Sequence, residues 1–258
     1  MAGWKKEPVD HRDQHLGLMG VSVLPPKHDA LAIMPPVNDQ GGIGSCVANG
    51  SSEAFEATEP VAVQPRRTYA RLYIYYYGRK LEGIPSTEDS GMYIRDGVKI
   101  LATKGACLES TWPYSDDARF SLQPPAAADV EAAQHKALMY YRCADSNGHG
   151  SVPVMKASIA QGFPVVFGFN VPQNFESDEC AKTGILHYPT SKEGFIGGHC
   201  VVAVGYDDTM VIDGVAGAFL CRNSWGEGWG LKGNFWMPYK FITAGLADDP
   251  WTIRRTSA

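Results

Sequence analysis

The order of its apolar patterns predicts that the chain has an α+β fold. Apolar residues recur at helical intervals in the first half of the chain, whereas short strand-like runs dominate the second half. Helices followed by strands are typical of α+β proteins. We therefore expect an N-terminal arm (residues 1–23), a mostly helical subdomain (24–122) and a β-rich, barrel-like subdomain (123–258). A cleft between the two subdomains is the expected place for a functional site.

Three helices are expected in the helical subdomain. The first follows Ser45, a typical N-cap residue, and buries an apolar face. The second runs from Pro65, a favoured first-turn residue, through Tyr77, and its tyrosines recur at intervals of three and four that are typical of a core-facing stripe. The third runs from about Met92 to Lys104 and ends before a glycine.

The β-rich subdomain is expected to contain strands and two further helices. The helices are expected near Val130 and over residues 155–160. The strands are expected over residues 138–143, 165–169, 200–206, 218–222 and 234–237.

The composition excludes several classes of function. The 258 residues include 23 Lys and Arg against 28 Asp and Glu, so the net charge is −5 and no basic excess is present to bind nucleic acid. No apolar run approaches the ~18 residues of a membrane-spanning helix, and no membrane partner is expected. The N-terminus stays polar through His15 and lacks the apolar stretch of a signal peptide. The protein is therefore expected to be cytoplasmic, or secreted with its signal already removed.

The six cysteines argue against a metal or another cofactor. They stand at positions 46, 107, 143, 180, 200 and 221. No two of them have the short spacing of zinc or redox motifs, so no metal site is expected. If one cysteine is a working thiol, five remain, and a fully disulfide-bonded framework within one chain is excluded.

Cys46 is the candidate nucleophile. It follows the expected N-cap, and a helix N-terminus lowers the pKa of a thiol. An arbitrary free cysteine is more often a small buried apolar residue, so the interpretation depends on partner residues. His199 follows Gly197 and Gly198, which leave space beside its ring, and Asn223 ends an expected strand. A base that takes the thiol proton, held in place by a third group, is what a nucleophilic cysteine requires.

Three ordered motifs resemble those of a known family. They are Gln40-Gly41-x-x-Gly44-Ser45-Cys46, Gly198-His199-Cys200-Val201-Val202 and Asn223-Ser224-Trp225-Gly226. His199 follows Cys46 by 153 residues, and Asn223 follows it by 177 residues. In order and spacing, the motifs resemble those of the papain-like cysteine peptidases over most of the chain, from about Leu24 to Tyr239.

The resemblance implies a two-subdomain peptidase that hydrolyses peptide bonds through a thioester on Cys46. His199 is then the general base and later the general acid, and Asn223 orients its ring. Gln40 and the backbone N–H of Cys46 form the oxyanion hole, in which one donor is worth about 3 kcal/mol. Trp225 covers the hydrogen bond between Asn223 and His199. The implied partner is a peptide or protein substrate, with no cofactor.

The resemblance also implies a substrate pocket. Gly91 pairs with extended substrate backbone, and Met92 lines an apolar pocket for the side chain second from the scissile bond. The full set of implied substrate-binding residues is Gly91, Met92, Tyr93, Gly168, Gly197 and Gly198. Ile43 replaces a disulfide-forming cysteine and Val47 replaces the usual tryptophan, so the match is closer to bacterial-type members.

The arm and the reaction leave alternatives open. The arm carries Trp4, Asp10, Arg12 and Asp13, and it either lies over part of the cleft or braces the β-rich subdomain. An amine in place of water would make the same site an acyl transferase or peptide ligase. Loss of activity would leave a papain-fold binding protein. The natural substrate, endo- or exopeptidase action and the oligomeric state stay open.

Overall fold

The structure is a computed structural model, and it describes residues 3–17, 23–60, 62–63 and 66–255. Residues 1–2 and 18–22 of the expected arm lie outside the described residues, and so does Pro65, the expected start of the second helix. The described residues form an α+β fold, as the sequence predicts.

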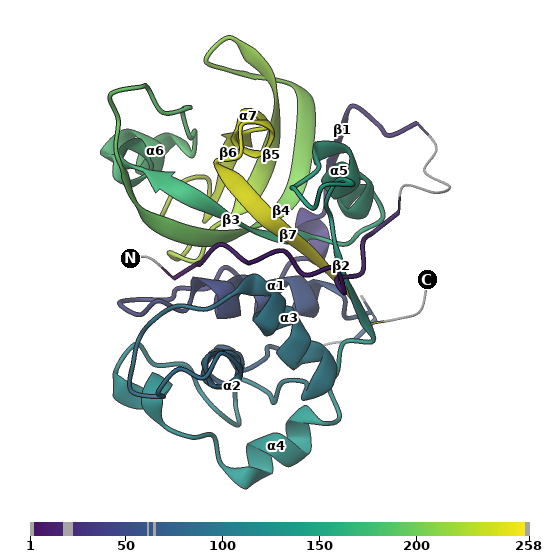
Figure 1. The fold of residues 1–258 in the computed structure, drawn as a ribbon, viewed down its shortest axis with the longest axis vertical. Helices are drawn as coiled ribbons and strands as arrows, with labels where there is room; N and C mark the ends of the chain where they lie inside the picture. Colours follow the sequence, from purple (N-terminus) through teal and green to yellow (C-terminus); the bar gives the residue numbers. More distant parts are fainter. Residues whose placement is uncertain (1–2, 18–22, 61, 64–65, 256–258) are drawn as a thin grey trace.

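An antiparallel sheet fills the upper half of the molecule in Figure 1. Its strands are β1 (Lys27–Asp29), β2 (Met139–Arg142), β3 (Val165–Pro172), β4 (Phe195–Ile212), β5 (Val215–Arg222), β6 (Asn234–Pro238) and β7 (Ala247–Arg254). The strand order is β2-β7-β3-β4-β5-β6, and β1 pairs with β4 outside this path. The long strand β4 therefore pairs with β1, β3 and β5 and is central to the sheet.

Helices form the lower half of the molecule and flank the sheet (Figure 1). The lower group consists of α1 (Cys46–Ala57), α2 (Arg71–Leu81), α3 (Ile94–Thr103) and α4 (Ala126–Ala132), and the upper group of α5 (Val152–Ala160), α6 (Asp178–Thr183) and α7 (Lys240–Thr243). Short 3-10 helices cover Leu31–Ile33, Ala118–Ser121 and Gln173–Glu176. The arm runs between the two halves.

Helix α1 lies at the junction of the two halves, and all of its residues are buried. Small residues allow this burial: a Cβ at Gly50 would come 3.3 Å from the side chain of Val202 in β4. Two buried carboxylates of α1 have hydrogen-bond partners: Glu53 accepts the backbone N–H of Asn38 at 3.0 Å, and Glu56 accepts that of Tyr69 at 2.7 Å. Packing on both layers thus overrides the low helix propensity of Gly50.

Two sequence-based boundaries are wrong, and one long strand was missed. The second helix begins at Arg71, because residues 66–70 are extended and Tyr69 bridges to another segment. Strand β4 begins at Phe195, so His199 lies inside the strand and not before it. Strand β7 was not expected, because its polar Asp248-Asp249-Pro250 segment hides the strand pattern.

Two elements pack across the expected division near residue 123. Strand β1 belongs to the sheet although it precedes the helices, and Ala128 and Ala132 of α4 lie in the core of the helical half. A second hydrophobic core lies on the β-rich side, around Phe169 and Phe175. Two cores fit two subdomains, and the exact division stays a prediction.

Packing around α1 predicts a large stability effect. Phe55 is completely buried against Tyr69, with ring centroids 4.8 Å apart. Phe55→Ala is expected to lower the free energy of unfolding by about 3–5 kcal/mol, because it leaves a cavity in the core. The matched control is Phe195→Ala in β4, where the ring is 49% exposed and the cost should be below about 1 kcal/mol. Urea unfolding of both variants measures the difference, and equal losses would contradict the assigned core.

Candidate active site

Cys46 is the first residue of α1 and is completely buried. The turn before it is held by hydrogen bonds from the helical half: Asp89 accepts the Gly44 N–H at 2.9 Å, and the Ser45 hydroxyl lies 2.7 Å from that of Tyr114. Ser45 makes no side-chain cap bond, so its expected capping role is wrong. Its hydroxyl bonds to other side chains because the turn is packed against the helical half.

His199 and Asn223 come together across two neighbouring strands. His199 lies in β4, and Asn223 follows β5, which pairs with β4. The imidazole Nε2 lies 2.8 Å from the amide Oδ1 of Asn223. An amide oxygen only accepts hydrogen bonds, so Nε2 carries the hydrogen and donates it, and Nδ1 is left as the basic nitrogen. The indole of Trp225 lies against the imidazole, with ring centroids 5.2 Å apart, and covers this bond.

Gln40 is buried and its side-chain amide is held at both ends. Its Oε1 accepts the Ser224 hydroxyl at 2.6 Å, and its Nε2 donates to the backbone oxygen of Ile43 at 2.9 Å. Its backbone N–H also donates to the oxygen of Ser224 at 2.9 Å. These bonds fix which end of the amide is the donor, and one N–H of Nε2 stays free to donate elsewhere.

Burial keeps the thiol and the imidazole neutral in this structure. Burial raises the pKa of the Cys46 thiol to about 12, although nearby backbone N–H groups oppose the shift. Burial also lowers the pKa of His199 to about 4, against the opposing effect of its hydrogen bond to Asn223. Desolvation disfavours the charged form of each group, and both shifts have this direction. At pH 7 the pair is therefore a neutral thiol and a neutral imidazole.

The arm lies beside Cys46 and causes part of this burial. The Gly3 N–H donates to the oxygen of Gly198 at 3.0 Å, and the Met92 N–H donates to the oxygen of Gly3 at 2.9 Å. A Cβ at Gly3 would come 2.7 Å from the Sγ of Cys46, and a Cβ at Gly91 would overlap the Gly3 carbonyl. The arm thus bonds to both halves of the molecule directly over the thiol.

The indole of Trp4 fills a pocket next to the thiol. Trp4 is only 6% exposed, and its indole N–H donates to Oδ2 of Asp249 at 3.2 Å. A Cβ at Gly168 would overlap the indole, and a Cβ at Gly198 would come 2.8 Å from Cε3 of the ring. Trp4 of the arm is therefore part of a hydrophobic core, together with residues of the helical half.

The six expected substrate-binding residues are partly brought together here. Four of them contact Gly3 or Trp4: Gly91, Met92, Gly168 and Gly198. Met92 does so through its backbone, because its methyl group packs against Gly78 in α2. Tyr93 contacts the arm further along, where the ammonium of Lys5 lies 5.0 Å from its ring centroid. Gly197 pairs with Val171 in the β3–β4 ladder and precedes Gly198 in β4.

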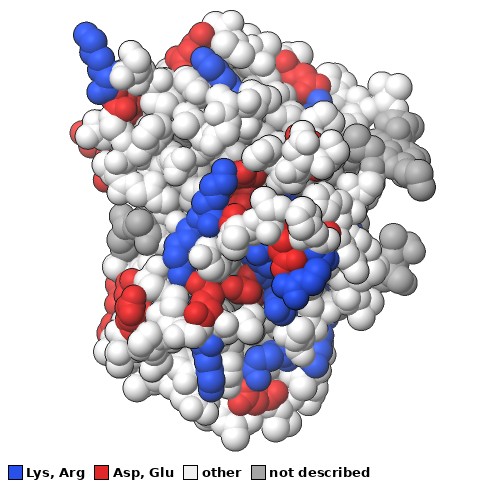
Figure 2. Space-filling model, viewed as in Figure 1, with Lys and Arg blue, Asp and Glu red and all other residues white. Residues whose placement is uncertain are grey.

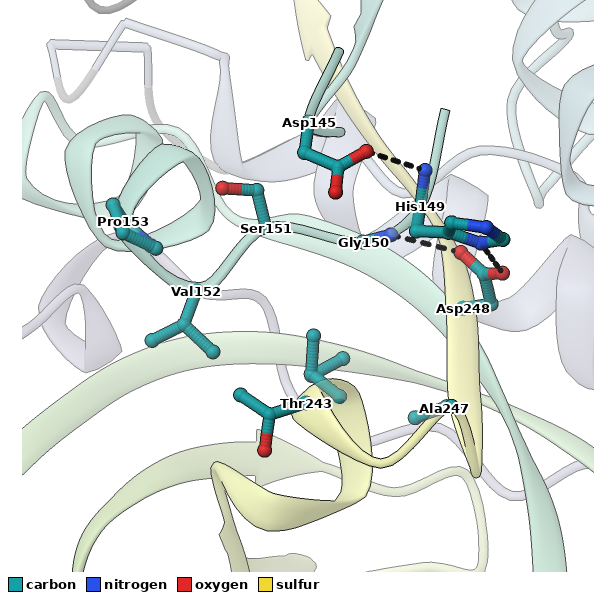
Figure 3. Close-up of a pocket in the computed structure, with 11 residues that line it drawn as sticks. Asp145, His149, Gly150, Ser151, Val152, Pro153, Thr243, Ala247 and Asp248 are labelled. Carbon is teal, nitrogen blue, oxygen red and sulfur yellow. Dashed lines mark hydrogen bonds and ion pairs between the residues drawn. The ribbon is translucent and has the colours of Figure 1, made fainter. Parts of the chain in front are cut away.

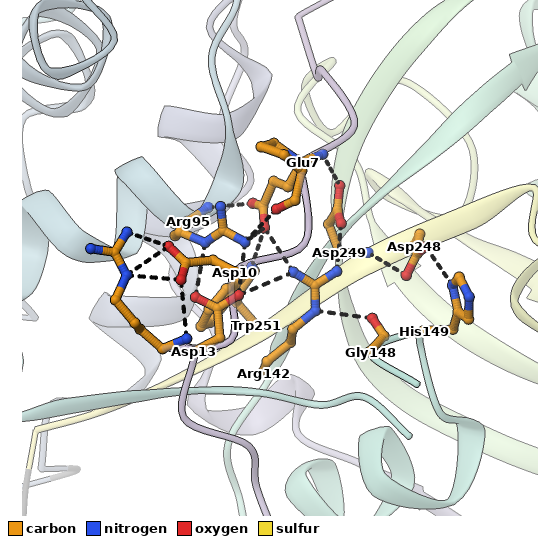
Figure 4. A network of polar contacts seen from close by, with 12 residues as sticks. Glu7, Asp10, Asp13, Arg95, Arg142, Gly148, His149, Asp248, Asp249 and Trp251 are labelled. Atoms are coloured by element: carbon orange, nitrogen blue, oxygen red, sulfur yellow. Dashed lines mark hydrogen bonds and ion pairs between the residues drawn. The ribbon is translucent and has the colours of Figure 1, made fainter. Parts of the chain in front are cut away.

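A buried network of charges anchors the arm (Figure 4). Glu7 accepts the backbone N–H of Arg95 at 2.5 Å, Nη1 of Arg142 at 3.0 Å and the indole N–H of Trp251 at 3.1 Å. Asp249 accepts Nη2 of Arg142 at 2.8 Å through Oδ1 and the Glu7 N–H at 2.9 Å through Oδ2. Burial and the neighbouring Asp249 carboxylate raise the pKa of Glu7.

Sequence reasoning missed most of this network. It singled out Asp10, Arg12 and Asp13, but only Asp13 joins the buried charges, at 2.7 Å from Nη2 of Arg95. The Asp10–Arg12 pair is local, and the Arg12 side chain is 90% exposed. The missed partners of Glu7 lie far from it in the sequence, so no local spacing of residues indicates that they pair. Figure 2 shows the acidic and basic side chains interleaved across the middle of this face.

Two cavities adjoin these features. One of about 490 Å³ lies beside the anchoring network, with His149 and Asp248 on its wall (Figure 3). Asp248 also binds Lys6 of the arm at 3.1 Å. The other, of about 400 Å³, is lined by Trp225 and Trp229 together with Asp39 and Glu176.

None of the six cysteines, which all lie among the described residues, is paired in a disulfide, and all of them are buried. Within the described ranges, no group of three or more His, Cys, Asp and Glu side chains is arranged to hold a metal ion. In that same part of the chain, no helix is both long and apolar enough to cross a membrane.

Several known proteins are similar to this chain in sequence or in fold. The model of the papain family cysteine proteases matches residues 82–252, which include His199 and Asn223 but not Cys46. An uncharacterized peptidase C1-like protein of Acanthamoeba polyphaga mimivirus is 40% identical over 225 residues, which are 85% of this chain and 70% of the viral protein. Cysteine proteinase 1 of Entamoeba histolytica is 28% identical over 83% of this chain and 63% of its own length.

A solved structure gives the same picture over nearly the whole chain. The crystal structure of xylellain, a cysteine protease from Xylella fastidiosa, has a TM-score of 0.86 and 35% identity, and the similarity covers 99% of this chain and 96% of xylellain. This relative is bacterial, in line with the sequence-based expectation. A family match over most of the chain, together with these relatives, shows that the protein belongs to the papain family of cysteine proteases.

Proposed function

We propose that this cysteine peptidase uses Cys46 as its nucleophile and that its N-terminal arm holds it latent. The observation that carries the first part is the Asn223–His199 hydrogen bond under Trp225, in a site where Cys46 begins a buried helix. The presence of the buried amide of Gln40 in the same site argues against a papain-fold protein that only binds.

The proposed reaction begins when the site is open. His199 takes the thiol proton, and the Cys46 thiolate adds to the substrate carbonyl carbon. The resulting oxyanion accepts hydrogen bonds from the Cys46 N–H and from the free N–H of Gln40. The imidazolium then gives its proton to the leaving amine, the C–N bond breaks, and a thioester on Cys46 remains.

The second half of the reaction regenerates the enzyme. Water attacks the thioester carbonyl while His199 takes one of its protons. The C–S bond breaks, the product leaves as a carboxylic acid, and the proton returns to Cys46. The hydrogen bond to Asn223 keeps the ring in one tautomer through both steps, so the same nitrogen serves as base and acid.

Chain direction explains why the arm would block the site and not be cut. The arm passes Cys46 at Gly3 and then places Trp4, the following residue, in the pocket. In a substrate, the residue in this pocket precedes the scissile carbonyl. The arm therefore runs opposite to the proposed substrate direction, and its Gly3 carbonyl is bonded to Met92.

The proposed roles predict the result of active-site labelling. Cys46→Ala is expected to remove both peptide cleavage and the mass adduct of an epoxysuccinyl inhibitor, and His199→Ala should weaken labelling strongly. Asn223→Ala is expected to lower kcat/KM by about tenfold or more, because the imidazole loses its fixed orientation. The control is Cys221→Ala, which removes another buried thiol. In this variant the inhibitor adduct on Cys46 should persist. An adduct on any other cysteine would contradict the assignment.

Burial by the arm predicts an unusual pH dependence of alkylation. A thiol with its pKa raised to about 12 contains little thiolate at lower pH. Iodoacetamide labelling of Cys46 in the intact chain is therefore expected to be slow at pH 7 and to rise only in strongly alkaline solution. Trp4→Ala removes the indole from the pocket and should speed labelling at pH 7, because a hydrated site favours the thiolate–imidazolium pair. Equally fast labelling of both chains would contradict the burial effect.

The anchoring network predicts how latency is relieved. Arg95→Met removes the partner of Asp13 and leaves buried carboxylates uncompensated, so the arm should detach more often and peptide turnover should rise several-fold. Arg12→Met makes the same chemical change in an exposed pair with Asp10, which contributes little. Its turnover should match that of the unaltered chain. Thermal unfolding measurements show whether both variants stay folded. Equal peptide turnover by the two folded variants would contradict the latency proposal.

A further inference from the structure

The pocket that Trp4 fills has a charged acceptor at its floor. Asp249 is completely buried, and its Oδ2 accepts two N–H groups of the arm, from the indole of Trp4 at 3.2 Å and from the backbone of Glu7 at 2.9 Å. Its Oδ1 accepts Nη2 of Arg142 at 2.8 Å. When the arm leaves, Arg142 stays on Oδ1, and Oδ2 loses both donors. A buried carboxylate oxygen without donors is costly, so a new donor in the pocket is favoured.

The walls of the pocket fit a two-ring side chain. Both Gly168 in β3 and Gly198 in β4 face the indole, and any larger residue at either position would meet the ring. Trp4 is nearly excluded from solvent in this space. A leucine or valine would therefore leave part of the pocket empty, which forfeits dispersion contacts.

Charge at the floor disfavours a basic side chain. Arg142 already pairs with Asp249, and Arg95 lies 3.5 Å from Glu7 in the same network. Glu7 and Asp13 belong to the arm and leave with it, whereas both arginines remain. A substrate Lys or Arg would meet one carboxylate and two guanidinium groups, while a neutral donor avoids this repulsion.

We propose that this pocket selects substrates with tryptophan second from the scissile bond, and that Asp249 binds the indole N–H. The inference rests on the proposed function and names its substrate class. It also refines the expectation of a merely hydrophobic side chain. Trp4 of the arm then occupies the pocket in the same way as the preferred substrate side chain, but the backbone of the arm runs opposite to that of the substrate.

The test is a competition between peptides in one reaction mixture. Peptides that differ only at this position carry Trp, 3-benzothienylalanine, Phe, Leu or Arg, and mass spectrometry follows the loss of each. Benzothienylalanine has the shape of tryptophan but a sulfur atom in place of the N–H group. Ratios of kcat/KM from such a mixture do not depend on the fraction of enzyme whose arm is displaced. Both the full-length Trp4→Ala chain and the unaltered chain can therefore be used.

The expected order puts Trp first. Trp should exceed benzothienylalanine by about tenfold, the effect of one hydrogen bond to a charged acceptor. Arg should be cleaved no faster than Phe. Equal cleavage of the Trp and benzothienylalanine peptides, or preference for Arg, would overturn this inference and leave the proposed function intact. No cleavage of any peptide by either chain would overturn the proposed function and this inference with it.

Two variants separate the acceptor from the shape of the pocket. Asp249→Asn should turn its amide NH₂ toward the pocket, because its oxygen stays on Arg142, and the ratio of Trp to benzothienylalanine should fall toward one. Asp248→Asn changes the neighbouring carboxylate, which binds Gly150 and Lys6 outside the pocket, and should leave the ratio unchanged. Gly168→Ala narrows the pocket and should shift preference from both two-ring side chains to Leu. An unchanged Trp preference in Asp249→Asn or Gly168→Ala would overturn the assignment.

Discussion

The close packing of α1 between the helices and the sheet is the constraint on which the active site depends. The helix is buried on every side, and Gly50 allows it to approach β4. Its first residue is Cys46, and β4 carries His199. Any change in the distance between α1 and β4 would therefore move the thiol relative to the imidazole. The core of this protein thus sets the positions of both groups directly, because they lie on two elements that pack against each other.

The sheet contributes orientation as well as position. Because β4 and β5 are paired, the residue after β5 lies beside the ring of His199, and Asn223 stands there. The following Trp225 covers the bond, and Ser224 holds the amide of Gln40. Three consecutive residues therefore support two different groups of the site. Rigid strands and buried hydrogen bonds give this support with little loss of entropy on substrate binding.

The arm changes the electrostatics of the site in addition to filling it. Gly3 and Trp4 exclude water from the cleft, and burial then favours the neutral forms of Cys46 and His199. The ion pair needed for attack is stable only where it is solvated or compensated. The proposed latency thus combines two effects of one segment, blocking and desolvation. Ion pairs of the buried Glu7 with Arg95 and Arg142 hold that segment in place, whereas the Asp10–Arg12 pair of the arm lies at the surface.

The sequence alone determined the fold class, the family and the identities of the candidate catalytic residues. Helix and strand periods are local, and the motifs around Cys46, His199 and Asn223 are contiguous, so short-range pattern was sufficient. The sequence pattern did not predict β7. Asp248 and Asp249 lie in this buried strand because Gly150, Arg142 and the arm supply hydrogen-bond partners for their carboxylates. Only the tertiary structure decided that the arm enters the cleft, that Trp4 fills the pocket and that Asp249 is its acceptor. Those contacts join residues far apart in the chain, 245 positions apart for Trp4 and Asp249. Such pairings depend on the packed fold and produce no periodic pattern in the sequence.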